Sequence, residues 1–414
     1  MQKTDHCESP TILIPVLDNT CELQSCLADV AGLALIRRVA LMGTKFGLSN
    51  LLVVFSTGEA RLGGALAGTG ARLAACTTMG AMDVVQTCNG SILLLAPDCL
   101  PDTDFLKQAG ETAIGENELL LWSQAQAMLI GSGCYPALQE AMAKAHDFAQ
   151  LYEAMRNSVE TGAVKALHEP AGLSIRSAKD CQRAENTLLS GLVKATEGWM
   201  ALHINRKISL TMTRRLMHTS VTPNHMTWVS MVLGLAGAIF FLSPEYGMQI
   251  LGASFFLLHS ILDGCDGELA RLKFMESRAG GVLDFWSDNV VHVSVFAAMA
   301  VGWAAHSPDS FWPWLCGLLA VGGTVVSASL VYFHTMRVEK KVGPLYTSVS
   351  TSEGKSAGVR IADMLSRRDF IYLVLVLALF DKTQWFLVMT AIGAPVYTLL
   401  LIFIMIREQG FNAR

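Results

Sequence analysis

Four aspartates within one apolar stretch of the chain have the type and spacing of a metal site. The stretch HSILDGCDGELARLKFMESRAGGVLDFWSDNVVH contains Asp263, Asp266, Asp284 and Asp288. The first two are three residues apart and the last two are four apart, so on helices each pair projects from one face. Charged side chains among membrane-spanning residues are costly and usually face a bundle interior, paired or bound to metal. The pattern therefore indicates a functional carboxylate cluster.

The chemistry of such a cluster favours divalent cations. Four carboxylates on two facing helices would repel one another and take up protons unless cations neutralised them. All-oxygen ligation suits Mg²⁺ or Mn²⁺, and two such ions could clamp a diphosphate and stabilise a leaving phosphate. The neighbouring Gly264, Gly267, Gly280 and Gly281 would let a phosphate or another helix come close.

A structural alternative assigns these aspartates to helix caps or to ion pairs at the membrane edge. The available partners are Arg271, Lys273 and Arg278. Capping and pairing could account for one or two acids. They do not account for four acids at paired helical spacing beside glycines in apolar sequence.

Residues 263–288 resemble the motif of the CDP-alcohol phosphotransferase (CDP-alcohol phosphatidyltransferase) family. In that motif D-x-x-D-G-x-x-A-R is followed by eight residues, G, three residues, D, three residues and D. Every position is met here, by Asp263, Asp266, Gly267, Ala270, Arg271, Gly280, Asp284 and Asp288. The resemblance implies that the four aspartates hold two metal ions and that Asp288 is also the catalytic base, which takes the proton of the acceptor hydroxyl. It further implies release of CMP, a six-helix fold, a site open to the cytosol and a homodimer.

The segment TPNHMT, residues 222–227, resembles the start of the family's first membrane helix. The resemblance implies that the CDP-alcohol contacts Thr222, Pro223, Asn224, Gly267, Ala270, Arg271 and Gly280. Simple capping explains the segment equally well, because Thr222 suits an N-cap and Pro223 suits the first turn of a helix.

Two arginines, Arg367 and Arg368, are candidates for binding an anionic acceptor such as a phosphorylated polyol. Guanidinium groups pair bidentately with phosphate, which favours that role. The alternative is that both are positive anchors of a cytoplasmic loop.

The elements that must position these residues are membrane helices. The chain has 414 residues, of which 52% are hydrophobic and 16% charged, against about 25% charged in soluble domains. Most of the hydrophobic segments approach the ~20 residues that a membrane span requires. These segments are 224–243, 248–270, 281–305, 310–336, a shorter one at 369–381, and 385–406. The sequence therefore predicts an all-α, six-helix transmembrane domain over residues 223–414.

The charges of the loops predict the orientation of a multi-pass protein. Two loops carry most of the positive charge: Arg271, Lys273 and Arg278 in one, and Arg337, Lys340, Lys341, Lys355, Arg360, Arg367 and Arg368 in the other. In the loops on the opposite side, SPEYGMQ, HSPDSFWP and DKTQ, Lys382 is the single Lys or Arg. By the positive-inside rule the charged loops and both termini face the cytoplasm. The opening residues show no secretory signal pattern, which agrees.

The front of the chain has the pattern of an α/β domain. Short apolar runs at 11–17, 50–56 and 91–97 are typical of buried parallel strands, and GLALIRRVALMGTKFG between the first two has helical spacing. We expect a cytosolic Rossmann-like domain with a parallel sheet over residues 1–175. Residues 176–222 should form juxtamembrane amphipathic helices, and Trp199, Arg206, Lys207, Arg214 and Arg215 suit a head-group interface. An ordinary solvated helix pair remains the alternative.

Residues 11–110 resemble a sugar-phosphate nucleotidyltransferase domain more faintly, with Asp98 in the place of a metal-binding acid. The loop LDNTCELQSCLADVAG departs from that family, because it has no glycine before Gly32 and no Lys or Arg before Arg37. The backbone of this loop therefore cannot come close to a triphosphate, and the loop has no cationic side chain to bind one. We expect a degenerate domain that has lost nucleotidyl transfer. The fusion resembles bifunctional enzymes that make CDP-inositol and condense it with inositol phosphate.

The whole sequence thus predicts a CDP-alcohol phosphotransferase whose donor is CDP-diacylglycerol or a CDP-polyol. Two alternatives stay open: a working bifunctional cytidylyltransferase and phosphotransferase of the inositol-phosphate type, and a carboxylate-lined cation transporter. The net charge of −4 shows no excess of positive charge of the kind typical of nucleic-acid binding. The ten cysteines form no CxxC pair, so we expect reduced thiols.

Overall fold

The computed structural model describes residues 9–17, 19–75, 90–123, 126–158, 164–192, 204–334 and 370–412, with the backbone alone for 166–170 and 407–412. The chain divides into two compact units, Met1–Leu188 and Leu189–Arg414.

The front unit is built on a seven-stranded sheet with the strand order β10-β8-β9-β6-β1-β4-β5. Its strands are β1 (Thr11–Val16), β4 (Leu51–Phe55), β5 (Arg72–Ala75), β6 (Ile92–Leu95), β8 (Leu119–Ser123), β9 (Ala127–Ile130) and β10 (Val164–Pro170). The three predicted strands are confirmed as β1, β4 and β6, and β1 pairs in parallel with the other two. All three are buried along their whole length, which explains their continuous apolar runs.

The parallel pairing expected of the sheet holds for β1, β4, β5 and β6 but does not extend to β9. This strand runs antiparallel to both of its neighbours, β6 and β8, so the sheet is mixed. Only a few residues join β8 to β9, and a connection that short can return the chain only in the opposite direction. Two small two-stranded pairs complete the unit: β2 (Asp29–Val30) with β3 (Leu33–Ala34), and β7 (Cys99–Pro101) with β11 (Gly172–Ser174).

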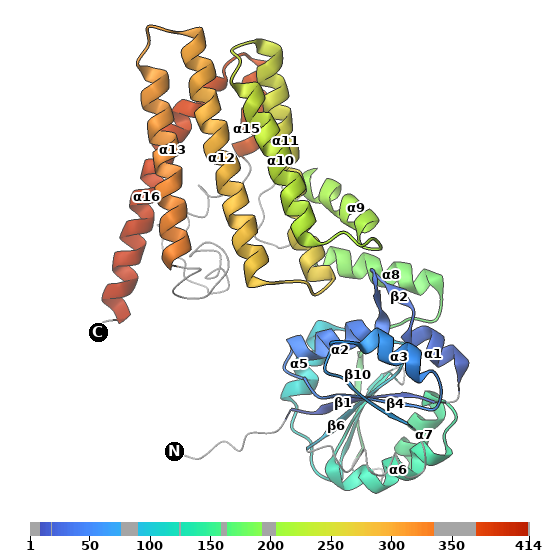
Figure 1. Ribbon diagram of the computed structural model, residues 1–414. Coiled ribbons are helices and arrows are strands. Elements are labelled where there is room, and N and C mark those ends of the chain that lie inside the picture. The colour runs from blue at the N-terminus through green and yellow to red at the C-terminus, as the bar shows by residue number, and fades with distance from the viewer. Residues whose placement is uncertain are drawn as a thin grey trace. The chain divides into compact units, whose positions relative to one another are not determined.

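Helices cover both faces of the sheet. Figure 1 shows α2 (Leu35–Lys45) and α3 (Glu59–Leu66) on one face and α6 (Tyr135–Lys144) and α7 (Phe148–Ser158) on the other. The predicted helix between the first two strands is confirmed as α2. The stretch expected to be a loop after β1 contains a further helix, α1 (Thr20–Cys26), capped by the side chain of Asn19. The other helices described in this part of the chain are η1 (Ser132–Cys134), α5 (Thr103–Glu111) and α8 (Ala178–Ser190), which extends two residues past the division between the units.

The second unit is a helix bundle with an amphipathic helix, α9 (Arg206–Leu216), before it. Among the described residues, five helices are long and apolar enough to cross a membrane. These are α10 (Pro223–Phe241), α11 (Tyr246–Leu272), α12 (Arg278–His306), α13 (Trp312–Val331) and α16 (Thr383–Asn412). The described part of α15 (Phe370–Leu379) has 10 residues, so a sixth membrane span stays a prediction.

One hydrophobic cluster of the bundle joins α15 to the five long helices. Buried Phe241 of α10, Phe256 of α11, Val295 of α12 and Val374 of α15 belong to the same hydrophobic cluster, together with Ala320 of α13 and Leu387 of α16. Large apolar side chains also cover the outer surface, among them Ile239, Leu318 and Leu399, each about two-thirds exposed. Such extensive apolar exposure is typical of a surface in contact with lipid.

Candidate active site

Three of the four predicted aspartates converge where α11 and α12 face each other. Asp263 and Asp266 of α11 are 3% and 5% exposed, and Asp284 of α12 is half-buried. Each offers one carboxylate oxygen, and these oxygens all lie within 4.8 Å of one another. The convergence that the paired spacing predicts is confirmed for these three side chains.

The donor set of this cluster fits a hard divalent cation. Opposite oxygen ligands of Mg²⁺ stand about 4.2 Å apart, at ~2.1 Å from the ion. The 4.8 Å limit on the three oxygens is close to that span, so small rotations of the carboxylates would complete ligation. Three oxygens with no sulfur or nitrogen in the group match Mg²⁺ or Mn²⁺.

The fourth aspartate, Asp288, lies outside that group of three but has a partner that the sequence analysis missed. Its Oδ1 lies 3.3 Å from Nε2 of His259, on α11. His259 precedes Asp263 by four residues and therefore shares its helix face. The spacing of four residues between His259 and Asp263 could have indicated that His259 lies beside the aspartates.

Helix α10 holds Asp266 directly. Thr227 is 2% exposed and donates a hydrogen bond of 2.5 Å from Oγ1 to Oδ2 of Asp266. Its hydroxyl also lies 3.3 Å from the carbonyl oxygen of Pro223, one turn earlier. The hydroxyl therefore links the first turns of α10 to a candidate metal ligand.

The start of α10 forms the cap that the sequence predicts. Thr222 Oγ1 accepts a hydrogen bond of 3.4 Å from the backbone N–H of His225, and His225 Nδ1 accepts one of the same length from the N–H of Thr222. Pro223 occupies the first turn. The capping role is thus confirmed, and nucleotide binding by this segment stays a prediction.

Two motif residues far apart in the sequence meet between α10 and α12. A Cβ atom at Gly280 would lie 3.3 Å from Oδ1 of Asn224 and 3.0 Å from Oγ of Ser277, the N-cap of α12. A side chain at this position would therefore push against both groups. The sequence predicts a close approach at Gly280, and in the structure the groups that come close are the first turns of α10 and α12.

The remaining motif residues lie along the last turns of α11. A Cβ atom at Gly267 would lie 3.3 Å from Nη1 of Arg271, so that guanidinium lies over the glycine. Ala270 is half-buried and its carbonyl accepts a 2.8 Å hydrogen bond from the N–H of Met275. Arg367 and Arg368, the candidates for acceptor binding, lie outside the described residues.

A second residue that sequence analysis missed is Glu268, whose side chain is fully buried two residues after Asp266. It accepts hydrogen bonds of 2.6 Å from Ser209 Oγ and Thr213 Oγ1, and it forms an ion pair with Arg206. All three partners lie on one face of α9. The neighbouring Gly264 also faces α9, since a Cβ atom there would be 3.7 Å from Nη1 of Arg206.

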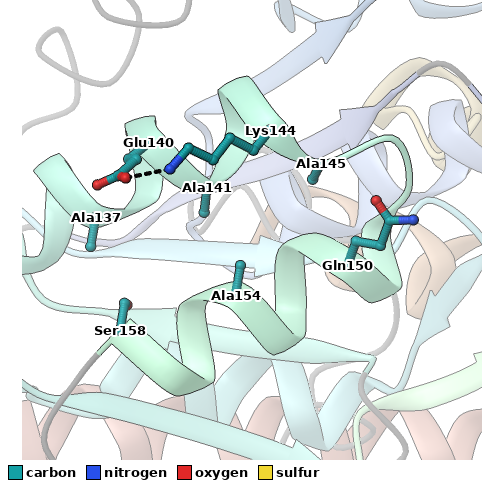
Figure 2. Close-up of a pocket in the computed structure, with 8 residues that line it drawn as sticks. All are labelled: Ala137, Glu140, Ala141, Lys144, Ala145, Gln150, Ala154 and Ser158. Carbon is teal, nitrogen blue, oxygen red and sulfur yellow. Dashed lines mark hydrogen bonds and ion pairs between the residues drawn. The ribbon is translucent and has the colours of Figure 1, made fainter.

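The front unit has polar features of its own. A groove of about 300 Å³ lies between α6 and α7, and its Lys144 and Glu140 form an exposed ion pair of 2.6 Å. Figure 2 shows the residues that line it. The groove contains none of the predicted site residues. Asp98, predicted in the place of a metal-binding acid, forms an ion pair of 2.6 Å with Arg176.

Comparison with known proteins finds matches to the region that carries the aspartates. Residues 220–352 match the family model described as CDP-alcohol phosphatidyltransferase. The chain is 35% identical over 157 residues to a bifunctional IPC transferase and DIPP synthase of Thermococcus kodakarensis, an alignment covering 38% of this chain and 34% of the relative. A protein of the same description from Aquifex aeolicus is 24% identical over 242 residues, 58% of this chain and 51% of the relative.

A relative with a different described activity also matches. The CDP-diacylglycerol–serine O-phosphatidyltransferase of Mycobacterium bovis is 32% identical over 101 residues, which is 22% of this chain and 34% of that protein. These alignments span between about a third and a half of the relatives' lengths. All four aspartates lie within residues 220–352, the part of this chain that matches the CDP-alcohol phosphatidyltransferase family model.

Proposed function

We propose that this chain is an integral membrane CDP-alcohol phosphotransferase, which moves a substituted phosphate from a CDP-alcohol to an acceptor hydroxyl and releases CMP. The observation that carries the proposal is the meeting of Asp263, Asp266 and Asp284 within 4.8 Å between two apolar helices. Buried carboxylates of one sign are retained at such a position for function rather than stability. The family match over residues 220–352 supports the same activity.

The proposed reaction is a displacement at the β-phosphorus of the donor. The acceptor oxygen forms a bond to that phosphorus, and the bond to the oxygen that bridges to CMP breaks. The hydroxyl proton passes to Asp288, whose carboxylate is 19% exposed and thus remains open to substrate. A carboxylate within hydrogen-bond reach of the acceptor suits general base catalysis.

Two divalent ions, Mg²⁺ or Mn²⁺, belong to the proposal. Asp263, Asp266, Asp284 and Asp288 would hold them, and when bound they would supply the positive charge that stabilises the diphosphate and the leaving CMP. Thr222, Pro223, Asn224, Gly267, Ala270, Arg271 and Gly280 are proposed to contact the CDP-alcohol. The neighbouring positions of Asn224 and Gly280 support a shared nucleotide pocket.

The donor is either CDP-diacylglycerol or a soluble CDP-polyol. The Mycobacterium bovis relative is named for the first donor, whereas four matching relatives are named bifunctional IPC transferase and DIPP synthase. Those names keep a bifunctional cytidylyltransferase and phosphotransferase as the alternative. We propose that Arg367 and Arg368 bind an anionic acceptor.

The proposal places both termini and the opening of the active site on the cytoplasmic side, because the positive-inside rule assigns the two loops rich in Arg and Lys to that side. It also includes a homodimer, as the family resemblance implies. Crosslinking in membranes, and labelling of single cysteines introduced into the loops, would test the two statements separately.

Purified full-length protein, assayed for CMP release with a panel of CDP donors and hydroxyl acceptors, tests the proposed function. Asp288→Asn should abolish CMP release while the protein still folds. Asp309→Asn, the same substitution in the exposed connection between α12 and α13, should have no effect. Equal CMP release by the Asp288→Asn protein would refute the proposal.

A cation transporter is the rival from another class, since a carboxylate cluster between membrane helices could also carry ions. It predicts Mg²⁺ or Mn²⁺ flux into liposomes without CMP formation. The complete motif, including Gly267, Ala270 and Arg271, favours the phosphotransferase, because ion transport has no need of these positions.

A further inference from the structure

The buried side of Asp288 has an anchor that lies outside the aspartate motif. His259 is 1% exposed, and its two ring nitrogens face two different helices: Nε2 lies 3.3 Å from Oδ1 of Asp288 on α12, and Nδ1 lies 2.9 Å from the carbonyl oxygen of Ser230 on α10. The ring therefore bridges α10 and α12 from its own position on α11.

Hydrogen-bond chemistry assigns the role of each nitrogen. A carbonyl oxygen can only accept, so Nδ1 carries a proton and donates it to Ser230. Attraction between Nε2 and the carboxyl group of Asp288 then needs a second proton, shared between those two atoms. The contact with His259 thereby sets the direction of the second Asp288 oxygen, which in the proposed function faces a metal ion or an acceptor hydroxyl.

The packing around His259 fixes the ring in place. A Cβ atom at Gly234 of α10 would lie 3.0 Å from Cγ of His259 and 2.4 Å from Cγ1 of Val291, so the ring occupies space that a glycine leaves open. Phe256 stacks on the imidazole with ring centroids 6.2 Å apart and an interplanar angle of 14°. The carbonyl of Ser230, the backbone at Gly234 and the ring of Phe256 thus hold the imidazole on three sides. A ring held in this way can fix the orientation of the carboxylate that it contacts.

We propose that His259 is a positioning residue that orients the Asp288 carboxylate for the phosphotransferase reaction. The inference rests on the proposed function, in which Asp288 takes the acceptor proton. His259 itself is too buried to touch substrate, so it acts through Asp288 alone. Loss of the Nε2 contact should let the carboxylate rotate away, and changes in such supporting hydrogen bonds typically cost 10–100-fold in activity.

Two substitutions of similar size separate positioning from packing. The amide nitrogen of glutamine reaches about as far as Nε2 of histidine, whereas that of asparagine reaches only the position of Nδ1. His259→Gln should therefore keep the contact with Asp288 and most of the activity. His259→Asn should lower kcat for CMP release about 10–100-fold with little change in KM for the donor, while both variants melt at similar temperatures. His306→Asn, at the exposed far end of α12, is the matched control.

The outcomes distinguish this inference from the function on which it rests. Full kcat in the His259→Asn protein, or equal loss in the asparagine and glutamine variants, would overturn the positioning role while an inactive Asp288→Asn protein still supports the phosphotransferase. If Asp288→Asn itself retains CMP release, the proposed function fails, and the role of His259 fails with it.

Discussion

The hydroxyl of Thr227 donates a 2.5 Å hydrogen bond to Oδ2 of Asp266, which lies 39 residues later in the chain. The other carboxylate oxygen of Asp266, Oδ1, accepts a hydrogen bond from the backbone N–H of Gly267, so the carboxylate is held on both sides. Thr227 is 2% exposed, so water cannot replace its hydroxyl readily. Helix α10 thus orients a carboxylate that belongs to α11.

Replacing Thr227 with valine should weaken metal binding, because valine keeps the shape and loses the donor. We expect the Mg²⁺ concentration that gives half-maximal CMP release to rise about 10–100-fold. Thr227→Ser, which keeps the hydroxyl, should remain near the wild type. A magnesium titration of CMP release measures the change, and identical titrations for the valine and serine variants would contradict it.

Mg²⁺ should stabilise the folded protein even without substrate. Asp263, Asp266 and Asp284 bring like charges together, so neutralisation by a bound cation favours the folded state. At a concentration of about 100 times Kd the gain is ~2.7 kcal/mol. Thermal unfolding in EDTA and in Mg²⁺ should therefore show a higher Tm with the ion.

Asp284→Asn provides the matching contrast in the same measurement. It should raise Tm in EDTA, because one repelling charge is removed, and it should reduce the shift that Mg²⁺ produces. The control substitution Asp309→Asn should change neither value. A Tm that does not respond to Mg²⁺ in the wild type would contradict a metal site at this cluster.

The sequence was sufficient to predict the elements with strong local patterns. Asp263, Asp266 and Asp284 stood out because charges are rare in apolar segments. The helical spacing of the acids predicted that two facing helices would bring these carboxylates together. The strands at Thr11–Val16, Leu51–Phe55 and Ile92–Leu95 were visible because both of their faces are buried.

The residues that escaped prediction depend on partners distant in the sequence. The carbonyl of Ser230 that fixes His259 is 29 residues away, and Ser209 and Thr213, which bind Glu268, are 59 and 55 residues away from it. Helix α1 has seven residues, too few to display a helical stripe. The short connection from β8 to β9 was a sign that β9 runs antiparallel to β8. The apolar run of β9 alone does not show in which direction the strand runs.

Glu268 should be a major stabilising contact of the bundle, because its buried carboxylate collects three donors from α9. Glu268→Gln removes the charge that Arg206 and two hydroxyls bind. Breaking a buried pair by removing one partner typically costs 3–5 kcal/mol, so we expect destabilisation of about 3 kcal/mol. Denaturant unfolding measures it, and Lys207→Gln on the exposed face of α9 is the control. A loss no greater than that of the control would contradict the role.

The stability of the front unit should depend on Glu22. Burial raises the pKa of this carboxyl, and Asp147 and Asp98 raise it further. A raised pKa means that the folded state binds the proton more tightly, so the unfolding free energy falls as pH rises above the usual value near 4.5. Glu22→Gln should slow hydrogen exchange in β1 at pH 8 and have little effect at pH 4. Equal exchange in both proteins at pH 8 would contradict this.

The same acids lead to the expectation that the front unit makes no CDP-alcohol from CTP. Glu22 lies in the first turn of α1, directly after β1, and accepts a 2.7 Å hydrogen bond from the N–H of Phe148. A triphosphate at that end of the strand would meet negative charge where binding needs cations. Asp98 is already paired with Arg176, whose pKa is raised chiefly by the hydrogen bond to that carboxylate.

Full-length protein supplied with CTP, Mg²⁺ and a panel of alcohol phosphates should therefore release no pyrophosphate. CMP release from a CDP-alcohol in the same preparation is the control that the protein is folded and active. Pyrophosphate formation that is lost in the Asp98→Asn variant would establish the bifunctional alternative, because it would require Asp98 to exchange Arg176 for a metal ion during turnover.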